Sequence, residues 1–173
     1  MTYSEIESIS GEHVTAEFDC GSDAQTTWLR RHALRADRTD TSKVRVVTRG
    51  GDPRVVGYYA LAAGSVELAN APTRIAKRMP RYPVRVVILT RLGVDRSEHG
   101  RGLGRALLRD VLLRVASASQ VLGARALLIH CENDDAKAFY RHIGEFEASP
   151  TDPLHLYLLM SDLRRTISGE DVG

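Results

Sequence analysis

Three alternating glycines, Gly100, Gly102 and Gly104, most limit how this chain can fold. They follow an apolar run over residues 84–94 that is long enough for a central strand. From Leu103 onward, apolar residues recur every fourth position, which is typical of an amphipathic helix. The segment therefore predicts a strand, a tight turn and a helix N-terminus. Glycines let backbone N–H groups approach a ligand and the helix adds the positive end of its dipole, so we expect a phosphate ligand.

Two interpretations of this turn are open from the residues alone. It is either a phosphate site, to which Arg96, Arg101 and Arg105 add charged donors, or a glycine-rich helix start without a ligand. Two known phosphate motifs are excluded. A P-loop requires Gly-Lys-Ser/Thr where residues 104–106 are Gly-Arg-Ala, and a dinucleotide-binding fold usually carries its glycines in an early strand–helix unit.

Upstream of the turn, the pattern predicts an N-terminal segment with a short strand, then a helix and a hairpin. Ser22 with a glutamine three residues later is a helix-cap signal, and the helix is expected over residues 23–36. Its inner side would carry Trp28, Leu29, His32 and Ala33. Hairpin strands are expected at residues 44–48 and 55–61, because glycine, aspartate and proline separate them. Residues 65–83 contain three prolines and predict a loop with one short helix.

Downstream of the turn, the chain alternates again between strand and helix patterns. A strand is predicted at residues 126–130, a helix at 134–142 and a last strand at 154–160. The inner face of the helix would consist of Ala136, Phe139, Tyr140 and Ile143. This order predicts an α/β or α+β fold around a mixed sheet, with one domain over residues 1–173 and a frayed tail after about residue 166.

Composition excludes several classes of protein. The 173 residues suffice for a core without disulfides, and Cys20 and Cys131 match neither a disulfide framework nor a metal-ligand spacing, so no metal is expected. The start of the chain lacks the basic and apolar regions of a signal peptide, and no apolar stretch is long enough to span a membrane. A cytoplasmic protein is therefore expected.

Charge is strongly segregated although the net charge is only +2. Residues 1–27 carry −6, residues 28–109 carry +12 and residues 110–173 carry −4. The basic middle block is either a surface that binds phosphate groups of a cofactor or nucleic acid, or a set of solvated arginines on several faces.

The turn resembles the acetyl-CoA site of the GNAT superfamily of N-acetyltransferases, whose pattern is Arg/Gln-x-x-Gly-x-Gly/Ala after the fourth strand. Gly102 and Gly104 fill the two small positions, while His99 stands where Arg or Gln is usual. The resemblance implies a mixed, mostly antiparallel sheet flanked by helices, with splayed central strands that hold acetyl-CoA. Gly93 inside an apolar strand fits a bulge or a close backbone approach there. The implied cofactor contacts in this half are Leu92, Gly93, Val94, His99, Gly100, Arg101, Gly102, Leu103, Gly104 and Arg105.

The second half of the implied site follows the strand at residues 126–130. Asn133 stands where the family often has an asparagine near the cofactor, although it also suits a helix cap. Phe139 and Tyr140 resemble the start of the family's Phe-Tyr-x-x-x-Gly-Phe signature, which makes Tyr140 the candidate general acid for the departing thiolate. The alternative is that both are core residues of a helix. Glu145 is an extra residue between Gly144 and the following phenylalanine.

A closer resemblance covers nearly the whole chain. The segments at residues 18–34, 55–66, 91–110 and 150–159 look like the GNAT toxins of bacterial type II toxin–antitoxin systems. Such toxins acetylate the α-amino group of aminoacyl-tRNA and so block translation. The resemblance implies a small ribbon-helix-helix antitoxin as a partner and allows a homodimer.

The chemistry of the chain is compatible with that acceptor. An α-amino group has a pKa near 8, so a fraction is neutral at pH 7 and a strong general base is less necessary; the sequence offers no obvious one. The alternatives are a GNAT enzyme that acetylates a small-molecule or peptide amine, and a non-enzymatic nucleic-acid-binding module. The residues expected to hold tRNA, unless they are only solvated, are Arg30, Arg31, Lys77, Arg78, Arg81 and Arg91.

Overall fold

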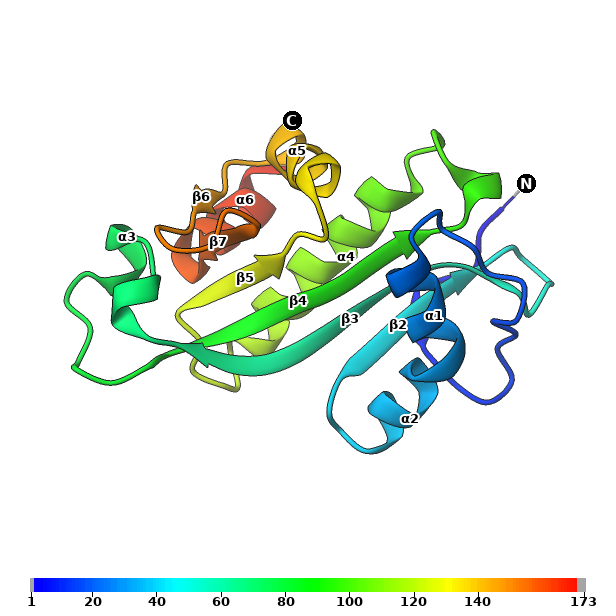
Figure 1. Cartoon of the computed structure of the whole chain (residues 1–173), viewed down its shortest axis with the longest axis horizontal. Coiled ribbons are helices and arrows are strands. Elements are labelled where there is room, and N and C mark those ends of the chain that lie inside the picture. The colour runs from blue at the N-terminus through cyan, green and yellow to red at the C-terminus, as the bar shows by residue number, and fades with distance from the viewer. Residues whose placement is uncertain (1, 171–173) are drawn as a thin grey trace. The chain divides into compact units, whose positions relative to one another are not determined.

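The structure is a computed structural model that describes residues 2–170. The chain divides into two compact units. Three elements that Figure 1 labels, β3 (Val55–Val66), β4 (Val84–Val94) and α4 (Leu103–Ala118), have residues in both units. The prediction of a single domain therefore stays a prediction. The first unit consists of Met1–Ala62 and Thr90–Val111, and the second of Ala63–Leu89 and Leu112–Gly173.

The predicted hairpin is confirmed in the first unit. β2 (Lys43–Thr48) and β3 (Val55–Val66) are antiparallel, with Val47 opposite Gly57. β3 is five residues longer than predicted. A short β1 (Glu7–Ser8) pairs antiparallel with β2, so the expected N-terminal strand is present.

The single helix predicted over residues 23–36 is wrong, because the chain forms two helices there. α1 (Asp23–Arg31) starts as predicted, since the Ser22 hydroxyl accepts a hydrogen bond of 3.2 Å from the Gln25 N–H. Helical geometry is lost at His32, whose φ is −124°, before α2 (Ala33–Arg38) begins. His32 is consequently exposed, not on the inner side. No glycine or proline marks this break.

An aromatic cluster joins α1 to β3. The ring of Phe18 meets Tyr58 edge-on at 5.6 Å, and Trp28 stacks on the same Tyr58 at 6.0 Å. The Tyr58 hydroxyl donates a hydrogen bond of 2.7 Å to the carbonyl of Gln25. Leu29 is buried in the same core, so α1 has a fixed place on the sheet.

The strand and helix on either side of the glycine turn are confirmed. β4 (Val84–Val94) has the predicted bounds, and α4 (Leu103–Ala118) begins at the predicted residue. Leu103 and Leu107 pack against β3 at Gly57. A Cβ atom at Gly57 would lie 2.9 Å from Val47 and 3.1 Å from Leu107, so only glycine permits this approach. The first turns of α4 are thereby fixed on β3.

The second unit contains the strands that follow β4 in the order of the sheet. β5 (Ala126–His130) pairs parallel with β4, from Val86 opposite Ala126 to Leu89 opposite Ile129. β7 (His155–Leu159) is antiparallel to β5, and β6 (Glu147–Ala148), which was not predicted, pairs antiparallel with β7. The seven described strands have the order β1-β2-β3-β4-β5-β7-β6, which is the predicted mixed sheet flanked by helices.

The remaining elements of this unit are helical. Residues 65–83 hold a 3-10 turn, η1 (Leu68–Asn70), and one short helix, α3 (Thr73–Ala76), close to the prediction. α5 (Asp134–Ile143) ends one residue later than predicted. A last helix, α6 (Met160–Glu170), was not predicted; it includes residues 168–170 of the tail expected to be frayed, and residues 171–173 lie outside the described residues.

Candidate functional site

The glycine turn has the left-handed geometry that its sequence indicates. After β4, the chain forms a 3-10 turn, η2 (Arg96–Glu98), and then passes through Gly100 with a φ of +77° and Gly102 with a φ of +81°. A Cβ atom at either glycine would find nothing within 4 Å. The space beside the turn is therefore open to a ligand.

The start of α4 supplies hydrogen-bond donors to that space. The carbonyl of Gly102 accepts the first helical hydrogen bond, from the Ala106 N–H at 3.1 Å. The N–H groups of Leu103, Gly104 and Arg105 precede it, and a helix offers its first N–H groups no carbonyl partner. Together with the positive end of the helix dipole, they suit an anionic group such as a diphosphate.

Asp95 fixes the link between β4 and the turn. One of its carboxylate oxygens accepts hydrogen bonds from the Ser97 N–H at 3.0 Å and the Ser97 hydroxyl at 2.6 Å, and the other accepts from the Asp19 N–H at 2.9 Å. Burial raises the pKa of Asp95, but these donors outweigh burial and hold the pKa below its ordinary value. The carboxylate therefore caps η2 in its ionised form.

The side chain of His99 turns back toward its own strand. Its Nε2 lies 2.7 Å from the carbonyl oxygen of Val94, although the residue is exposed. The imidazole thus closes the start of the turn, where the family pattern has Arg or Gln. A direct contact of His99 with a ligand stays a prediction.

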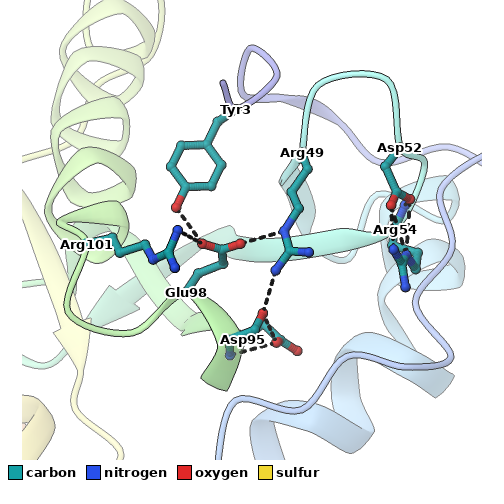
Figure 2. Close-up of polar contacts among 8 residues, drawn as sticks. Tyr3, Arg49, Asp52, Arg54, Asp95, Glu98 and Arg101 are labelled. Carbon is teal, nitrogen blue, oxygen red and sulfur yellow. Dashed lines mark hydrogen bonds and ion pairs between the residues drawn. The ribbon is translucent and has the colours of Figure 1, made fainter. Parts of the chain in front are cut away.

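A buried carboxylate beneath the turn was missed by the sequence reasoning. Glu98 is 1% exposed, and it accepts hydrogen bonds from the Tyr3 hydroxyl at 2.7 Å and from Arg49 Nε at 2.6 Å (Figure 2). Arg101 Nη1 lies 3.7 Å from Oε2 of Glu98, the oxygen that also accepts from Tyr3. Arg49 also donates to the Ser97 hydroxyl at 3.0 Å. The sequence shows only a lone acid between two arginines, because the partners come from residues 49 and 95 positions away.

The tyrosine hydrogen bond lowers the pKa of Glu98, and Arg49 and Arg101 add to that effect against the opposing effect of burial. The pKa of Tyr3 is raised, first by burial and then by the same carboxylate. Glu98 is therefore an ionised, fully paired group at neutral pH.

The end of β4 is packed more closely than the sequence indicates. A Cβ atom at Gly93 would lie 3.2 Å from the Tyr58 ring and 3.3 Å from the Cys20 sulfur, so a larger residue would require these side chains to shift. Leu92 and Val94, its neighbours on β4, are half-buried. The pairs between β4 and β5 end at Leu89, while β4 continues to Val94. Pairing of this strand end with a cofactor stays a prediction.

In the second unit, Asn133 is the N-cap of α5. Its side-chain oxygen accepts a hydrogen bond of 2.9 Å from the Ala136 N–H. The segment before it is held because the Cys131 N–H donates to the Leu154 carbonyl at 2.8 Å. Lys137 Nζ donates to the Pro153 carbonyl at 2.6 Å. The cap role of Asn133 is confirmed, and its expected place near a cofactor stays a prediction.

Tyr140 lies on the buried side of α5 and is 5% exposed. Phe139 is half-buried, with its ring 5.3 Å from that of Tyr140 in an edge-on arrangement. Burial raises the pKa of Tyr140 well above its ordinary value, and Cys131 and Glu132 add to the effect. The phenol therefore keeps its proton at neutral pH and is available as a donor.

The extra residue after Gly144 lies on the surface, and the phenylalanine that follows it packs back on the glycine. Glu145 is exposed, and Phe146 lies against Gly144, where a Cβ atom would be 3.2 Å from the ring. Gly144 has a φ of −153°, so close packing rather than backbone freedom explains the glycine. The insertion is absorbed downstream of Tyr140.

The arginines predicted to bind tRNA in the first unit differ in their surroundings. Arg30 and Arg31 are exposed at the end of α1 and line a groove together with Arg35 and Arg38 of α2. Arg91 is half-buried: its guanidinium lies 5.1 Å above the Trp28 ring and 3.3 Å from the Gln25 side-chain oxygen. That arrangement combines a cation–π contact with a hydrogen bond, so Arg91 is the most constrained of the set.

In the second unit, Lys77, Arg78 and Arg81 are exposed and follow α3. Arg74 in the same basic stretch is bound internally, because its Nη1 donates at 2.7 Å to both Glu147 and Asp162. The basic stretch therefore contains both accessible and internally paired cations.

Two other kinds of site are absent from residues 2–170. This part of the chain contains no group of histidine, cysteine or acidic residues that could hold a metal ion. It also contains no helix long and apolar enough to cross a membrane.

A stacked pair, His130 and His155, lies where β5 ends and β7 begins, with the rings 4.4 Å apart.

Comparison with known proteins places these features in a family. The family model of the acetyltransferase (GNAT) domain matches residues 44–144. A tRNA-acetylating toxin of Mycobacterium tuberculosis (strain ATCC 25618 / H37Rv) is 48% identical over 165 residues, which are 95% of this chain and 97% of that protein.

Solved structures of another protein, AtaT, are similar to this chain over almost its full length. AtaT complexed with acetyl-methionyl-tRNAfMet has a TM-score of 0.86 at 26% identity, covering 96% of this chain and 99% of that one. AtaTR bound with AcCoA has a TM-score of 0.83 at 26% identity, covering 95% and 98%. A mutant AtaT toxin bound to the C-terminus of the antitoxin AtaR has a TM-score of 0.81 at 25% identity, covering 95% and 97%.

Proposed function

This chain belongs to the GNAT acetyltransferase family, and from that premise we propose that it transfers an acetyl group from acetyl-CoA to the α-amino group of aminoacyl-tRNA. Blocked aminoacyl-tRNA cannot accept a peptide, so the protein would act as a toxin that stops translation. The observation that carries the acceptor is the 48% identity, over almost the full length of both chains, to a tRNA-acetylating toxin.

Acetyl-CoA fits the glycine turn of the first unit. The left-handed Gly100 and Gly102 leave open space beside the free N–H groups at the start of α4. These donors would bind the diphosphate of the donor substrate, with Arg101 and Arg105 adding charge. The α4 donors include the N–H groups of Leu103 and Gly104, and we propose further contacts with the donor from Leu92, Gly93, Val94 and His99 in the same unit. Asn133 and Phe139 of the second unit stay predicted cofactor contacts.

Tyr140 is the proposed general acid. The neutral amine of the acceptor attacks the thioester carbonyl, a C–N bond forms and the C–S bond breaks. Tyr140 would give its proton to the departing sulfur and regain one from solvent, while water takes the proton of the amine. Burial keeps the phenol of Tyr140 protonated at neutral pH, so it can donate a hydrogen bond to the departing sulfur. The raised pKa itself makes the phenol a weaker acid, so the proposed role depends on its position in the family signature and not on the shift.

The α-amino acceptor suits a site of this kind. Its pKa near 8 leaves an appreciable neutral fraction at pH 7, whereas a lysine side chain would be almost fully protonated. The reaction therefore does not require a strongly basic residue, and the described residues around Tyr140 include none that we assign as a base.

Basic side chains, most of them exposed, would bind the phosphate backbone of tRNA. In the first unit these are Arg30 and Arg31, extended by Arg35 and Arg38 along the same groove, and Arg91 beside Trp28. In the second unit they are Lys77, Arg78 and Arg81. Binding through such residues should weaken steeply as salt is added.

The partners follow from the same proposal. A relative is bound by the C-terminus of its antitoxin, so we infer that an antitoxin, of the ribbon-helix-helix class, neutralises this chain. A homodimer is part of the same expectation. Aminoacyl-tRNA as the acceptor would place the reaction in the cytoplasm.

The test is an acetylation assay with purified protein, radiolabelled acetyl-CoA and a set of individually charged tRNAs. We expect label on the aminoacyl group of at least one tRNA, and none on uncharged tRNA. Expression should arrest growth, and co-expression of the antitoxin should restore it. If every charged tRNA remained unlabelled while a free amine or peptide was acetylated, the alternative of a small-molecule or peptide N-acetyltransferase would replace this proposal.

A further inference from the structure

We infer that Glu98 is a positioning residue for the acetyl donor: it holds the glycine turn and Arg101 in the geometry that binds the diphosphate. This inference rests on the proposed function of the turn. Glu98 lies directly before the turn, yet its carboxylate points inward and is almost completely buried. An acid beneath an anion site opposes binding by its charge alone, so its presence requires a structural reason.

The contacts of Glu98 supply that reason. Tyr3 donates to one carboxylate oxygen at 2.7 Å and Arg49 to the other at 2.6 Å, so both sides of the carboxylate are held (Figure 2). These two donors are themselves fixed, because the Gly50 N–H donates to the Thr2 carbonyl at 2.7 Å. Glu98 is thus tied to two segments of the first unit that are paired with each other, since Tyr3 and Arg49 also form an antiparallel bridge.

Arg101 connects this anchor to the turn. It lies between the two left-handed glycines, Gly100 and Gly102, and its guanidinium is 3.7 Å from Glu98. The flanking glycines have little conformational preference of their own, so a charge interaction at the residue between them restricts both. Glu98 therefore restrains Arg101, the residue in the middle of the turn, whose side chain is otherwise 58% exposed.

The charges of the Glu98 network itself remain favourable for an anion. Glu98 contributes one negative charge, whereas Arg49 and Arg101 contribute two positive charges. The two arginines therefore offset the repulsion between the Glu98 carboxylate and a bound anion. The carboxylate also orders the turn before the donor binds. Preorganisation of this kind improves binding because less ordering is required when the ligand binds.

The test compares Glu98→Gln with the unmodified full-length chain. An amide has one acceptor oxygen and one NH2 donor, so one of the two donors to Glu98 would face another donor, and the attraction to Arg101 is lost. We expect the dissociation constant of acetyl-CoA, measured by calorimetry, and its KM to rise about tenfold. The kcat and the KM for the acceptor should change by less than about twofold. Hydrogen exchange over residues 99–104 of the free protein should become faster.

The matched control is Glu17→Gln. Glu17 makes an exposed ion pair with Arg54 at 3.1 Å in the same unit, outside this network, and its loss should leave donor binding unchanged. Tyr3→Phe removes a single hydrogen bond to Glu98 and should raise the KM for acetyl-CoA about two- to fivefold. It tests the inference independently if Glu98→Gln does not fold.

Three outcomes would overturn the inference. The first is an unchanged affinity for acetyl-CoA in Glu98→Gln, provided that this variant folds. If Glu98→Gln does not fold, an unchanged affinity in Tyr3→Phe has the same meaning. A fall in kcat with unchanged KM would indicate a merely structural role and would also overturn it. Absence of acetyl-CoA binding to the unmodified chain would overturn the proposed function as well, which distinguishes the two failures.

Discussion

Gly102→Ala tests whether the left-handed turn is what binds the acetyl donor. The φ of Gly102 is +81°, and a Cβ atom there would meet nothing within 4 Å, so the substitution adds backbone strain without a clash. A non-glycine residue in this region costs about 1–2 kcal/mol. The open space beside Gly102 leaves room for a local shift of its backbone in the free protein. The strain should then return when the donor binds, because binding requires the original geometry of the turn. We expect acetyl-CoA binding to weaken about 5- to 30-fold.

Gly51→Ala is the matched control. Gly51 also has a φ of +81°, and a Cβ atom there would likewise meet nothing within 4 Å, but it lies in the turn between β2 and β3. Its strain of about 1–2 kcal/mol should appear only in stability, as a melting temperature lower by about 2–8 °C. Acetyl-CoA affinity should be unaffected.

The assay is isothermal titration of acetyl-CoA into each purified variant, with a thermal melt of the same sample. Binding by Gly102→Ala as tight as that of the unmodified chain, together with the expected loss of melting temperature in Gly51→Ala, would refute the reasoning. The left-handed turn would then not be the diphosphate site.

Three further predictions use other parts of the structure. Tyr140→Phe should lower kcat about 100-fold or more with acetyl-CoA affinity unchanged, and equal turnover would reduce Tyr140 to a packing role. Gly57→Ala should lower the free energy of unfolding in urea by about 1–3 kcal/mol, because its Cβ would overlap Val47. Burial, and then His155, lower the pKa of His130 below its ordinary 6.5, so the unfolded chain takes up this proton first and stability should fall as pH drops below 6.5. His130→Asn should flatten that part of the pH profile of unfolding.

The strands and helices next to the turn could be predicted from the sequence. β4 has the predicted bounds, α4 begins at the predicted Leu103, and β5 has the predicted bounds, since each has an unbroken apolar pattern and clear flanking signals. The Ser22 cap was also predictable, because a cap depends on residues only three positions apart. By contrast, the break at His32 carries no local signal, and the two-residue β6 exists only because β7 lies beside it.

The features of the candidate site also fall into two groups, those that the sequence predicts and those that only the tertiary structure shows. The sequence by itself determined that a glycine turn would connect a strand to a helix N-terminus, because backbone conformation there depends on neighbouring residues. Only the tertiary structure decided that Glu98 is buried beneath that turn and that Tyr3 and Arg49 hold it. It also decided that Gly93 serves packing against Tyr58. These contacts join residues far apart in sequence, so they depend on how the strands and loops pack and leave no pattern among neighbouring residues.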